Sequence, residues 1–240
     1  MNKKYLKTIY ILFKKELMHY FNSPIAYIFI AVFLIVGNWL YFNSFFLVGQ
    51  ASMRQYFLLL PWIFLFLCPA VTMRLWAEEK KSGTVEFLMT LPITDWQVVL
   101  GKFFGSLIFI FISLLLSFSI PVSLYFIGNL DFGPIIGSYL GALFLSGSYL
   151  ALGIFISSLT KNQIIAFLLS IIACFAFFVI GADFVLSKAP LFAVPVMSFI
   201  GLGSHFDNIA KGVIDSKDVI YYICFIFLFL WLNVKSLKYE

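Results

Sequence analysis

Side chains that could carry acid–base or nucleophilic chemistry are scarce in this chain. Ser204, His205 and Asp207 stand close together, and these are the residue types of a hydrolase site. A nucleophile and its base must however be brought together by the fold, and here Ser204 and His205 are neighbours without a glycine-framed nucleophile turn. We therefore interpret His205, and His19 as well, as solvated or interfacial side chains. The sequence predicts no catalytic residue and no enzyme activity.

The pair Gly101-Lys102 comes nearest to a nucleotide-binding motif. A phosphate-binding loop has the spacing G-x-x-x-x-G-K-[ST], whose backbone N–H groups hold the phosphates while the last hydroxyl binds magnesium. Here the earlier glycine is missing and Phe103 follows the lysine. We therefore expect no cofactor on this chain, neither ATP nor magnesium.

The three cysteines stand singly inside apolar stretches. They are Cys68, Cys174 and Cys224. Neither metal-ligand spacing nor a disulfide framework is visible, so we interpret them as small packing residues and predict no metal site.

The composition indicates a membrane protein. Hydrophobic residues make up 62% of the chain and charged residues 11%, whereas soluble domains have about 45–50% and about 25%. Uncharged stretches reach the roughly 20 residues that a spanning helix needs, without the alternation of a membrane barrel. The net charge of +5 comes from basic residues beside these stretches, which does not suggest nucleic acid. We expect one all-α transmembrane domain over 1–240.

Six membrane-spanning helices are expected. Their approximate bounds are 25–47, 55–73, 103–127, 134–159, 163–182 and 219–234. The last has only 16 uncharged residues, so it would begin a turn earlier or thin the bilayer locally. No expected span has a charged residue near its centre, which argues against an ion-coupled carrier.

The distribution of basic residues predicts the orientation. With both termini on one side of the membrane, only four of the 16 Lys and Arg residues fall on the other side, which leaves twelve with the termini. The four are Arg54, Lys188, Lys211 and Lys217. Because Lys and Arg accumulate on the cytoplasmic side, we expect both termini to be cytoplasmic.

Segments outside the spans have patterns of their own. Residues 1–24 predict an interfacial amphipathic helix, which either anchors the chain or also holds a partner, and Pro24 then begins the first span. Its apolar stripe is Leu6, Ile9, Tyr10, Phe13, Leu17, Tyr20 and Phe21. Segment 183–218 contains prolines and glycines, which favours a re-entrant hairpin or interfacial helices on the outer side. Gly137 and Gly141 form a G-x-x-x-G contact, within the chain or to a second copy.

The polar segment 74–102 is the most informative part of the chain. Gly83 is placed to end a cytoplasmic extension of the second span in a left-handed cap, and Thr84 to cap a new short helix. Phe87, Leu88 and Leu91 give this helix an apolar side, and Glu86 lies near its positive N-terminus. Pro92 ends it, and a capping box of Thr94 with Gln97 begins the helix that continues into the third span.

A protein docked on this short helix could move two spans at once. Helix caps also occur in ordinary solvated loops, so the residue pattern alone leaves both interpretations open.

The same segment resembles the loop of ABC type-2 permeases, which commonly shows two acidic residues, a Gly-Thr pair, an acidic residue, apolar residues, a proline and later a Gly-Lys pair. The matching residues are Glu78-Glu79, Gly83-Thr84-Val85-Glu86-Phe87-Leu88, Leu91-Pro92-Ile93 and Leu100-Gly101-Lys102. The stretches KKELMHYFNSPIAYIF, 153–163 and SHFDNIAKGVIDSKDVIYY are also similar to this family, and most similar to its gliding-motility-associated branch.

The resemblance implies a permease subunit in the bacterial cytoplasmic membrane. It would pair with a second permease subunit, of the same or a related chain, and with cytoplasmic ABC ATPase subunits that bind ATP and magnesium. The implied coupling residues are Glu78, Glu79, Gly83, Thr84, Glu86, Phe87, Leu88 and Pro92. Such a complex would use ATP hydrolysis to move a substrate, most simply outward. The alternative is a membrane scaffold of a motility or secretion machine that carries no cargo.

Overall fold

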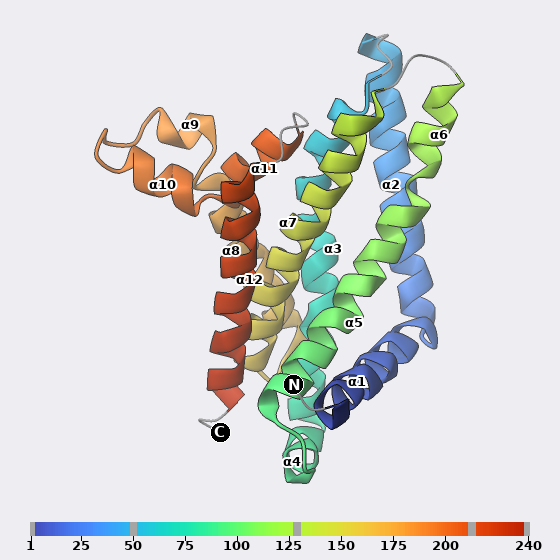
Figure 1. Ribbon diagram of the computed structural model, residues 1–240, viewed down its shortest axis with the longest axis vertical. Helices are drawn as coiled ribbons and strands as arrows, with labels where there is room; N and C mark the ends of the chain where they lie inside the picture. The colour runs from blue at the N-terminus through green and yellow to red at the C-terminus, as the bar shows by residue number, and fades with distance from the viewer. Residues whose placement is uncertain (1–2, 49–51, 127–130, 211–214, 238–240) are drawn as a thin grey trace.

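The computed structural model of the chain describes residues 3–48, 52–126, 131–210 and 215–237, and every regular element in these ranges is a helix. The helices are α1 (Lys3–Phe21), α2 (Pro24–Val48), α3 (Arg54–Lys81), α4 (Thr84–Thr90), α5 (Asp95–Leu116), α6 (Ser119–Tyr125), α7 (Phe132–Ser158), α8 (Gln163–Val179), α9 (Asp183–Leu186), α10 (Val194–Ile200), α11 (Leu202–Ala210) and α12 (Ser216–Leu237). The end of the bundle where α1 begins, α12 ends and α4 lies is called the proximal end, and α9, α10 and α11 lie at the distal end (Figure 1).

Five helical segments of the described residues are long and apolar enough to cross a membrane. They are Pro24–Phe46, Arg54–Lys81, Asp95–Tyr125, Phe132–Ser158 and Ser216–Leu237. The last is longer than the sequence suggested, because its helix takes in polar residues at both ends. The expected span 163–182 corresponds to α8, an apolar helix of 17 residues, about 26 Å long. The six-span count therefore stays a prediction.

The third expected span, 103–127, is bent near the distal end, and its last residue lies outside the described part of the chain. Pro121 has no N–H to donate to the carbonyl of Ser117, and its ring crowds that carbonyl. The helix accordingly separates into α5 and α6, where the Phe118 N–H donates to the Leu115 carbonyl at 3.1 Å and the Ile120 N–H to the Ser117 carbonyl at 3.0 Å.

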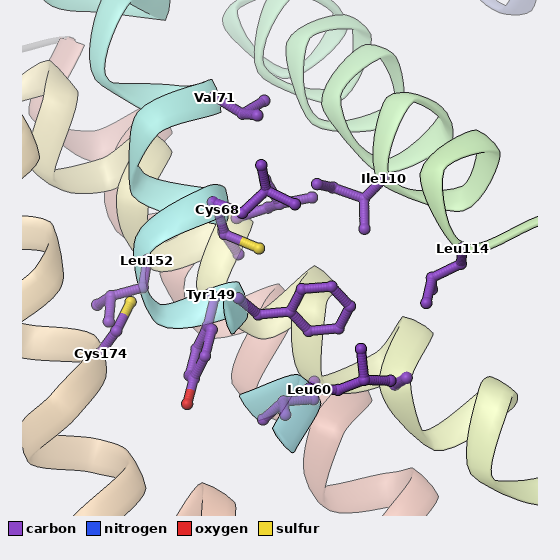
Figure 2. Packing of buried hydrophobic residues seen from close by; sticks show 14 of the residues in the cluster. Leu60, Cys68, Val71, Ile110, Leu114, Tyr149, Leu152 and Cys174 are labelled. Atoms are coloured by element: carbon purple, nitrogen blue, oxygen red, sulfur yellow. The ribbon is translucent and has the colours of Figure 1, made fainter. Parts of the chain in front are cut away.

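The centre of the bundle is the contact of α3 with α7, flanked by α5 and α8. Cys68 of α3, Ile110 of α5, Tyr149 of α7 and Cys174 of α8 are all fully buried in one apolar cluster (Figure 2). The interpretation of the cysteines as packing residues is confirmed for Cys68 and Cys174, whereas Cys224 is exposed on α12.

Glycines of α7 permit close helix contacts within the chain. A Cβ atom on Gly153 would lie 2.2 Å from Oγ1 of Thr72 in α3, and one on Gly141 would lie 2.5 Å from Cγ2 of Ile209 in α11. Gly137, one turn away, is also buried. Gly141 of the G-x-x-x-G pair thus faces α11 of the same chain.

Segment 183–218 forms the short helices α9, α10 and α11 before α12 begins, and residues 211–214 of it lie outside the described part. Their place on the outer side of a membrane stays a prediction. Of the two alternatives for His205, the solvated side chain is wrong because α11 turns the ring inward, and an interfacial position stays a prediction. His205 is 8% exposed, and its Nδ1 lies 2.6 Å from Oδ1 of the buried Asp218.

We predict that Gly153→Ala lowers the stability of the bundle by about 1–3 kcal/mol, the usual cost of overpacking, because the new methyl group would overlap Thr72. The thermal unfolding midpoint in mild detergent measures the effect. Gly133→Ala is the matched control in the same helix, since nothing in the described part lies within 4 Å of its new Cβ. Equal midpoints for the two variants would contradict the close α3–α7 contact.

Candidate functional site

The polar loop at the proximal end has most of the helix ends and starts that the sequence predicts. Helix α3 ends at Lys81, and Gly83 has a φ of 71°, a left-handed conformation that favours glycine. After α4, Leu91 is extended before Pro92, as the residue before a proline prefers. The Thr94 N–H then donates to Oε1 of Gln97 at 2.9 Å in a complete capping box. Helices α3 and α5 are therefore joined through α4, which has about two turns.

Thr84 does not cap α4, contrary to the prediction. The left-handed turn makes Gly83 the N-cap residue and places Thr84 inside the helix. Its hydroxyl instead donates to the carbonyl of Glu79 at 3.2 Å and contacts Oγ of Ser82 at 3.0 Å. Thr84 thus satisfies a carbonyl at the end of α3, which every helix leaves unpaired, and ties α4 to α3.

The residues expected to form the apolar side of α4 differ in exposure, and Leu91 follows the last helical residue, Thr90. Leu88 and Val85 are half-buried against the bundle. Phe87 is 69% exposed and Leu91 is 40% exposed. Glu86 is exposed beside Phe87. Helix α4 therefore rests on the bundle through one side and presents an aromatic ring and a carboxylate outward.

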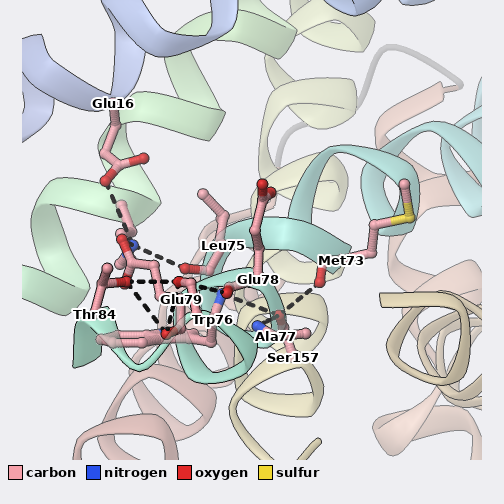
Figure 3. A network of polar contacts seen from close by, with 11 residues as sticks. Glu16, Met73, Leu75, Trp76, Ala77, Glu78, Glu79, Thr84 and Ser157 are labelled. Carbon is pink, nitrogen blue, oxygen red and sulfur yellow. Dashed lines mark hydrogen bonds and ion pairs between the residues drawn. The ribbon is translucent and has the colours of Figure 1, made fainter. Parts of the chain in front are cut away.

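A buried lysine lies directly above this loop. Lys102 of α5 is 2% exposed, and its Nζ lies 2.7 Å from Oε1 of Glu79, 2.8 Å from the Leu75 carbonyl and 3.4 Å from Oε1 of Glu16. The three N–H donors of an ammonium group thus match three acceptors. The same Nζ is 4.7 Å from the centre of the Trp76 ring, within cation–π range. Figure 3 shows Glu16 reaching this network from another helix than Glu79.

Close backbone approach brings Glu16 over Lys102. A Cβ atom on Gly101 would lie 2.7 Å from Cβ of Leu12, and one on Gly105 would lie 2.8 Å from Cβ of Glu16. These two glycines form a G-x-x-x-G pair on α5, and helix α1 lies in the shallow groove that they leave. The Glu16–Lys102 ion pair and the close contact at the two glycines therefore hold α1 against α5 at the same place.

Neither Glu16 nor Lys102 was predicted as a site residue. The spacing of Gly101 and Gly105 was a signal for a close helix contact, and a lysine just inside an apolar stretch was a signal for an internal partner. The identity of that partner has no local signature, because Glu16 lies 86 residues away from Lys102 in the chain.

The second half of α1 is held on α3. The Tyr20 hydroxyl donates to the carbonyl of Val71 at 3.0 Å, and the Arg74 guanidinium lies 4.7 Å from the centre of the Tyr20 ring. Burial raises the pKa of Tyr20 well above its usual range, so this hydroxyl stays a donor. The predicted helix at the N-terminus is therefore a packed element of the bundle, and its position in a membrane interface stays a prediction.

The end of α3 is also connected to α7. Oγ of Ser157 donates to the Met73 carbonyl at 2.9 Å and accepts from the Trp76 and Ala77 N–H groups at 3.2 Å (Figure 3). In an uninterrupted helix the Ala77 N–H donates to the Met73 carbonyl. Here the Ser157 hydroxyl is inserted between these two groups and bonds to both of them. The end of α3 that carries Glu78 and Glu79 is thus joined to the centre of the bundle.

The same end of α7 is joined to α12. The Oγ atoms of Ser158 and Ser236 lie 2.7 Å apart, and Nδ2 of Asn233 donates to the Ile154 carbonyl at 3.0 Å. Lys80 of α3 also donates to the Ser158 carbonyl. Polar contacts therefore link α1, α3, α5, α7 and α12 within a few turns of α4.

A cavity of about 230 Å³ opens beside the lysine network. Its lining residues are Lys15, Glu16, His19, Arg74, Leu75, Glu78, Glu79, Ser82, Thr84 and Lys102. Three carboxylates and three Lys or Arg side chains face this cavity, so its charge balances and favours neither a metal cation nor a phosphate.

We predict that Lys102→Met destabilises the protein by about 3–5 kcal/mol, because it leaves the Glu16 and Glu79 carboxylates buried without their cation. Thermal unfolding in mild detergent is the measurement. Adding Glu79→Gln should recover part of the loss, since one uncompensated charge is then removed. Lys217→Met is the control, because that lysine pairs with Asp215 at an exposed site and its loss should leave the midpoint unchanged. Similar midpoints for both lysine variants would contradict the role of the buried network.

A known protein family matches most of the chain. Residues 10–232 match the family described as ABC-2 family transporter protein. The range contains α3, α4 and α5 with the whole lysine network. No curated protein matches the chain.

Proposed function

The chain belongs to the ABC-2 family of transporter proteins, and from this premise we propose that it is the membrane-spanning permease subunit of an ABC transporter. It is a multi-pass membrane protein. A separate nucleotide-binding subunit supplies ATP hydrolysis and binds ATP and magnesium, and this chain couples that hydrolysis to substrate movement, most simply export. The complex sits in the cytoplasmic membrane of a bacterium, with both termini and α4 on the cytoplasmic side.

The exposed side of α4 carries the proposal. Phe87 and Glu86 face outward at the proximal end, beyond the bundle, where a cytoplasmic subunit would meet them. A ring of this size exposed outside the membrane is the kind of residue that a partner's pocket buries, and the adjacent carboxylate suits a basic residue at the rim. These two side chains make the contact with the ATPase subunit.

The other loop residues transmit the contact. Gly83 and Pro92 fix the direction of α4, Thr84 joins it to α3, and Leu88 rests it on the bundle. Glu79 passes a displacement of α3 to α5 and α1 through Lys102. Glu78 is exposed at the end of α3, at the edge of the contact.

The exposed apolar side of the bundle near α2 supports the proposal that a second permease subunit binds there. Of the five long apolar segments, α2 has the smallest share of its residues buried, 28% against 78% for α7. An apolar groove of about 500 Å³ lies between α2 and α3, lined by residues such as Val32, Trp62 and Phe66. We assign this side to the pairing of two permease subunits. The likeness to the gliding-motility-associated branch extends the proposal to a transporter that serves motility.

The deciding experiment is purification of the tagged chain in mild detergent after crosslinking in cells, with mass spectrometry of what co-purifies. A stoichiometric protein with a phosphate-binding loop supports the permease, and tagged and untagged copies recovered together show pairing of identical chains. Recovery of the chain alone favours the scaffold. A catalytically inactive ATPase partner separates the two further, because transport fails with it while a scaffold keeps its function.

We predict that Glu86→Lys and Phe87→Ala each reduce the stimulation of the partner's ATPase activity by roughly tenfold, which is about 1.4 kcal/mol. Membrane insertion and the unfolding midpoint should stay unchanged, because both side chains are exposed. Glu79→Lys should also uncouple the ATPase, but with loss of stability, since it places a second cation beside Lys102. Asp215→Lys at the distal end is the charge-reversal control. Full stimulation by the Glu86 and Phe87 variants would remove α4 from the coupling site.

A further inference from the structure

The distal end holds a buried histidine that no part of the proposed coupling mechanism uses. His205 of α11 is 8% exposed, and Asp218 in the first turn of α12 is fully buried. Nδ1 of the ring lies 2.6 Å from Oδ1 of Asp218, and Nε2 lies 3.0 Å from the carbonyl oxygen of Phe199 in α10. Three short stretches of chain therefore meet at one imidazole.

Both ring nitrogens face atoms that only accept hydrogen bonds. A carbonyl oxygen has no proton, and neither does an ionised carboxylate. A neutral imidazole carries one N–H, so it would leave one bare nitrogen lone pair against an oxygen at hydrogen-bonding distance. Turning the ring over would place a carbon atom on each acceptor. The geometry is satisfied when the pair holds one proton more than a neutral imidazole and a carboxylate.

We infer that His205, Asp218 and the Phe199 carbonyl form a proton-binding site that fastens α10 and α11 to α12. The bound proton sits on the imidazole, because imidazole is the stronger base of the two groups. The resulting imidazolium donates to Asp218 through Nδ1 and to Phe199 through Nε2. The proton comes from, and returns to, the water at the distal end.

The surroundings of the ring favour a cation. The Tyr221 ring is stacked on the imidazole with centroids 3.9 Å apart and an angle of 19° between planes. Nδ2 of Asn208 lies 3.5 Å from the second oxygen of Asp218, and the Tyr222 ring is 6.4 Å from the imidazole. An aromatic face and a carboxylate both stabilise a positive charge.

Charged groups beyond this first layer are few in the described part of the chain. From α12, Lys217 is close enough to Asp218 to interact electrostatically, but its ammonium group is held by Asp215 at 3.0 Å. From α11, Asp207 is close enough to Tyr222 to interact electrostatically. Helix α10 has no charged side chain, and it contributes the Phe199 carbonyl and the Phe199 ring, whose centroid lies 6.2 Å from that of the imidazole. Asp218 is the carboxylate that contacts the ring.

Two tyrosine hydroxyl groups add hydrogen bonds to those that the protonated His205 makes between the distal helices. The Tyr221 hydroxyl donates to the Ile200 carbonyl, and the Tyr222 hydroxyl donates to the Leu202 carbonyl at 2.9 Å. These bonds join α12 to the junction of α10 and α11. When the pH rises far enough to remove the proton, either the Asp218 carboxylate or the Phe199 carbonyl loses its hydrogen-bond donor. The contact of α10 and α11 with α12 then weakens. The distal helices are therefore held more firmly at low pH than at high pH.

Nitrogen-15 NMR of the full-length protein in detergent micelles tests the site directly, because protonated and bare ring nitrogens have well-separated signals. The chain has two histidines, so His19→Gln leaves only the signals of His205. At about pH 8 we expect both ring nitrogens of His205 to be protonated, because each of them faces an acceptor. A bare nitrogen on His205 at that pH would overturn the inference.

Asp218→Asn is the second variant, chosen because it keeps shape and hydrogen bonding. An asparagine N–H can donate to Nδ1 while Nε2 donates to Phe199, so a neutral ring then satisfies every partner. We expect this variant to show one bare ring nitrogen at about pH 8, and its unfolding midpoint to fall less than that of the wild type between about pH 6 and pH 9. Equal falls in the two proteins, or two protonated nitrogens in Asp218→Asn, would refute a proton held by this pair.

Discussion

A lysine ammonium group inside the helix bundle sets the arrangement of the proximal end. Removing such a charge from water costs several kcal/mol, and the cost is recovered only where acceptors surround it closely. Lys102 finds these acceptors on two other helices, Glu16 of α1 and Glu79 with the Leu75 carbonyl of α3. The registers of α1, α3 and α5 are therefore mutually dependent, and a shift of any one of them by a turn would leave a buried charge without its partner.

Small residues make this arrangement possible. Lipid gives helices little hydrophobic reason to associate, so close backbone contact and hydrogen bonds must supply the attraction. Gly101 and Gly105 let α1 approach α5, and Gly153 lets α3 approach α7. The polar bridges then form where the backbones are already close, as Ser157 does on α3. The loop that contains α4 is thus held in place by specific contacts between helices, whereas α2 makes few such contacts in the described part of the chain.

The sequence predicted most of what is encoded locally and missed what is encoded by distant contacts. The left-handed Gly83, the stop at Pro92 and the Thr94 capping box depend on neighbouring residues, and all three were confirmed, whereas Thr84 lies one residue too late to cap α4. Which residues of α4 are covered depends on the bundle beside it, so the exposure of Phe87 could not be predicted from the segment alone. The partners of Lys102 and His205 lie in other helices, and no spacing rule identifies them.

Under the proposed function, the exposed Phe87 ring on α4 has a consequence for how the subunits would reach their proper ratio in the cell. Phe87 is shielded only when another protein covers it, so a copy that waits unassembled displays an apolar side chain to the surrounding water. Chaperones and proteases select chains by such features. If Phe87 contacts an ATPase subunit as proposed, surplus copies of this chain would be removed while assembled ones persist, and Phe87 would report whether a partner is present.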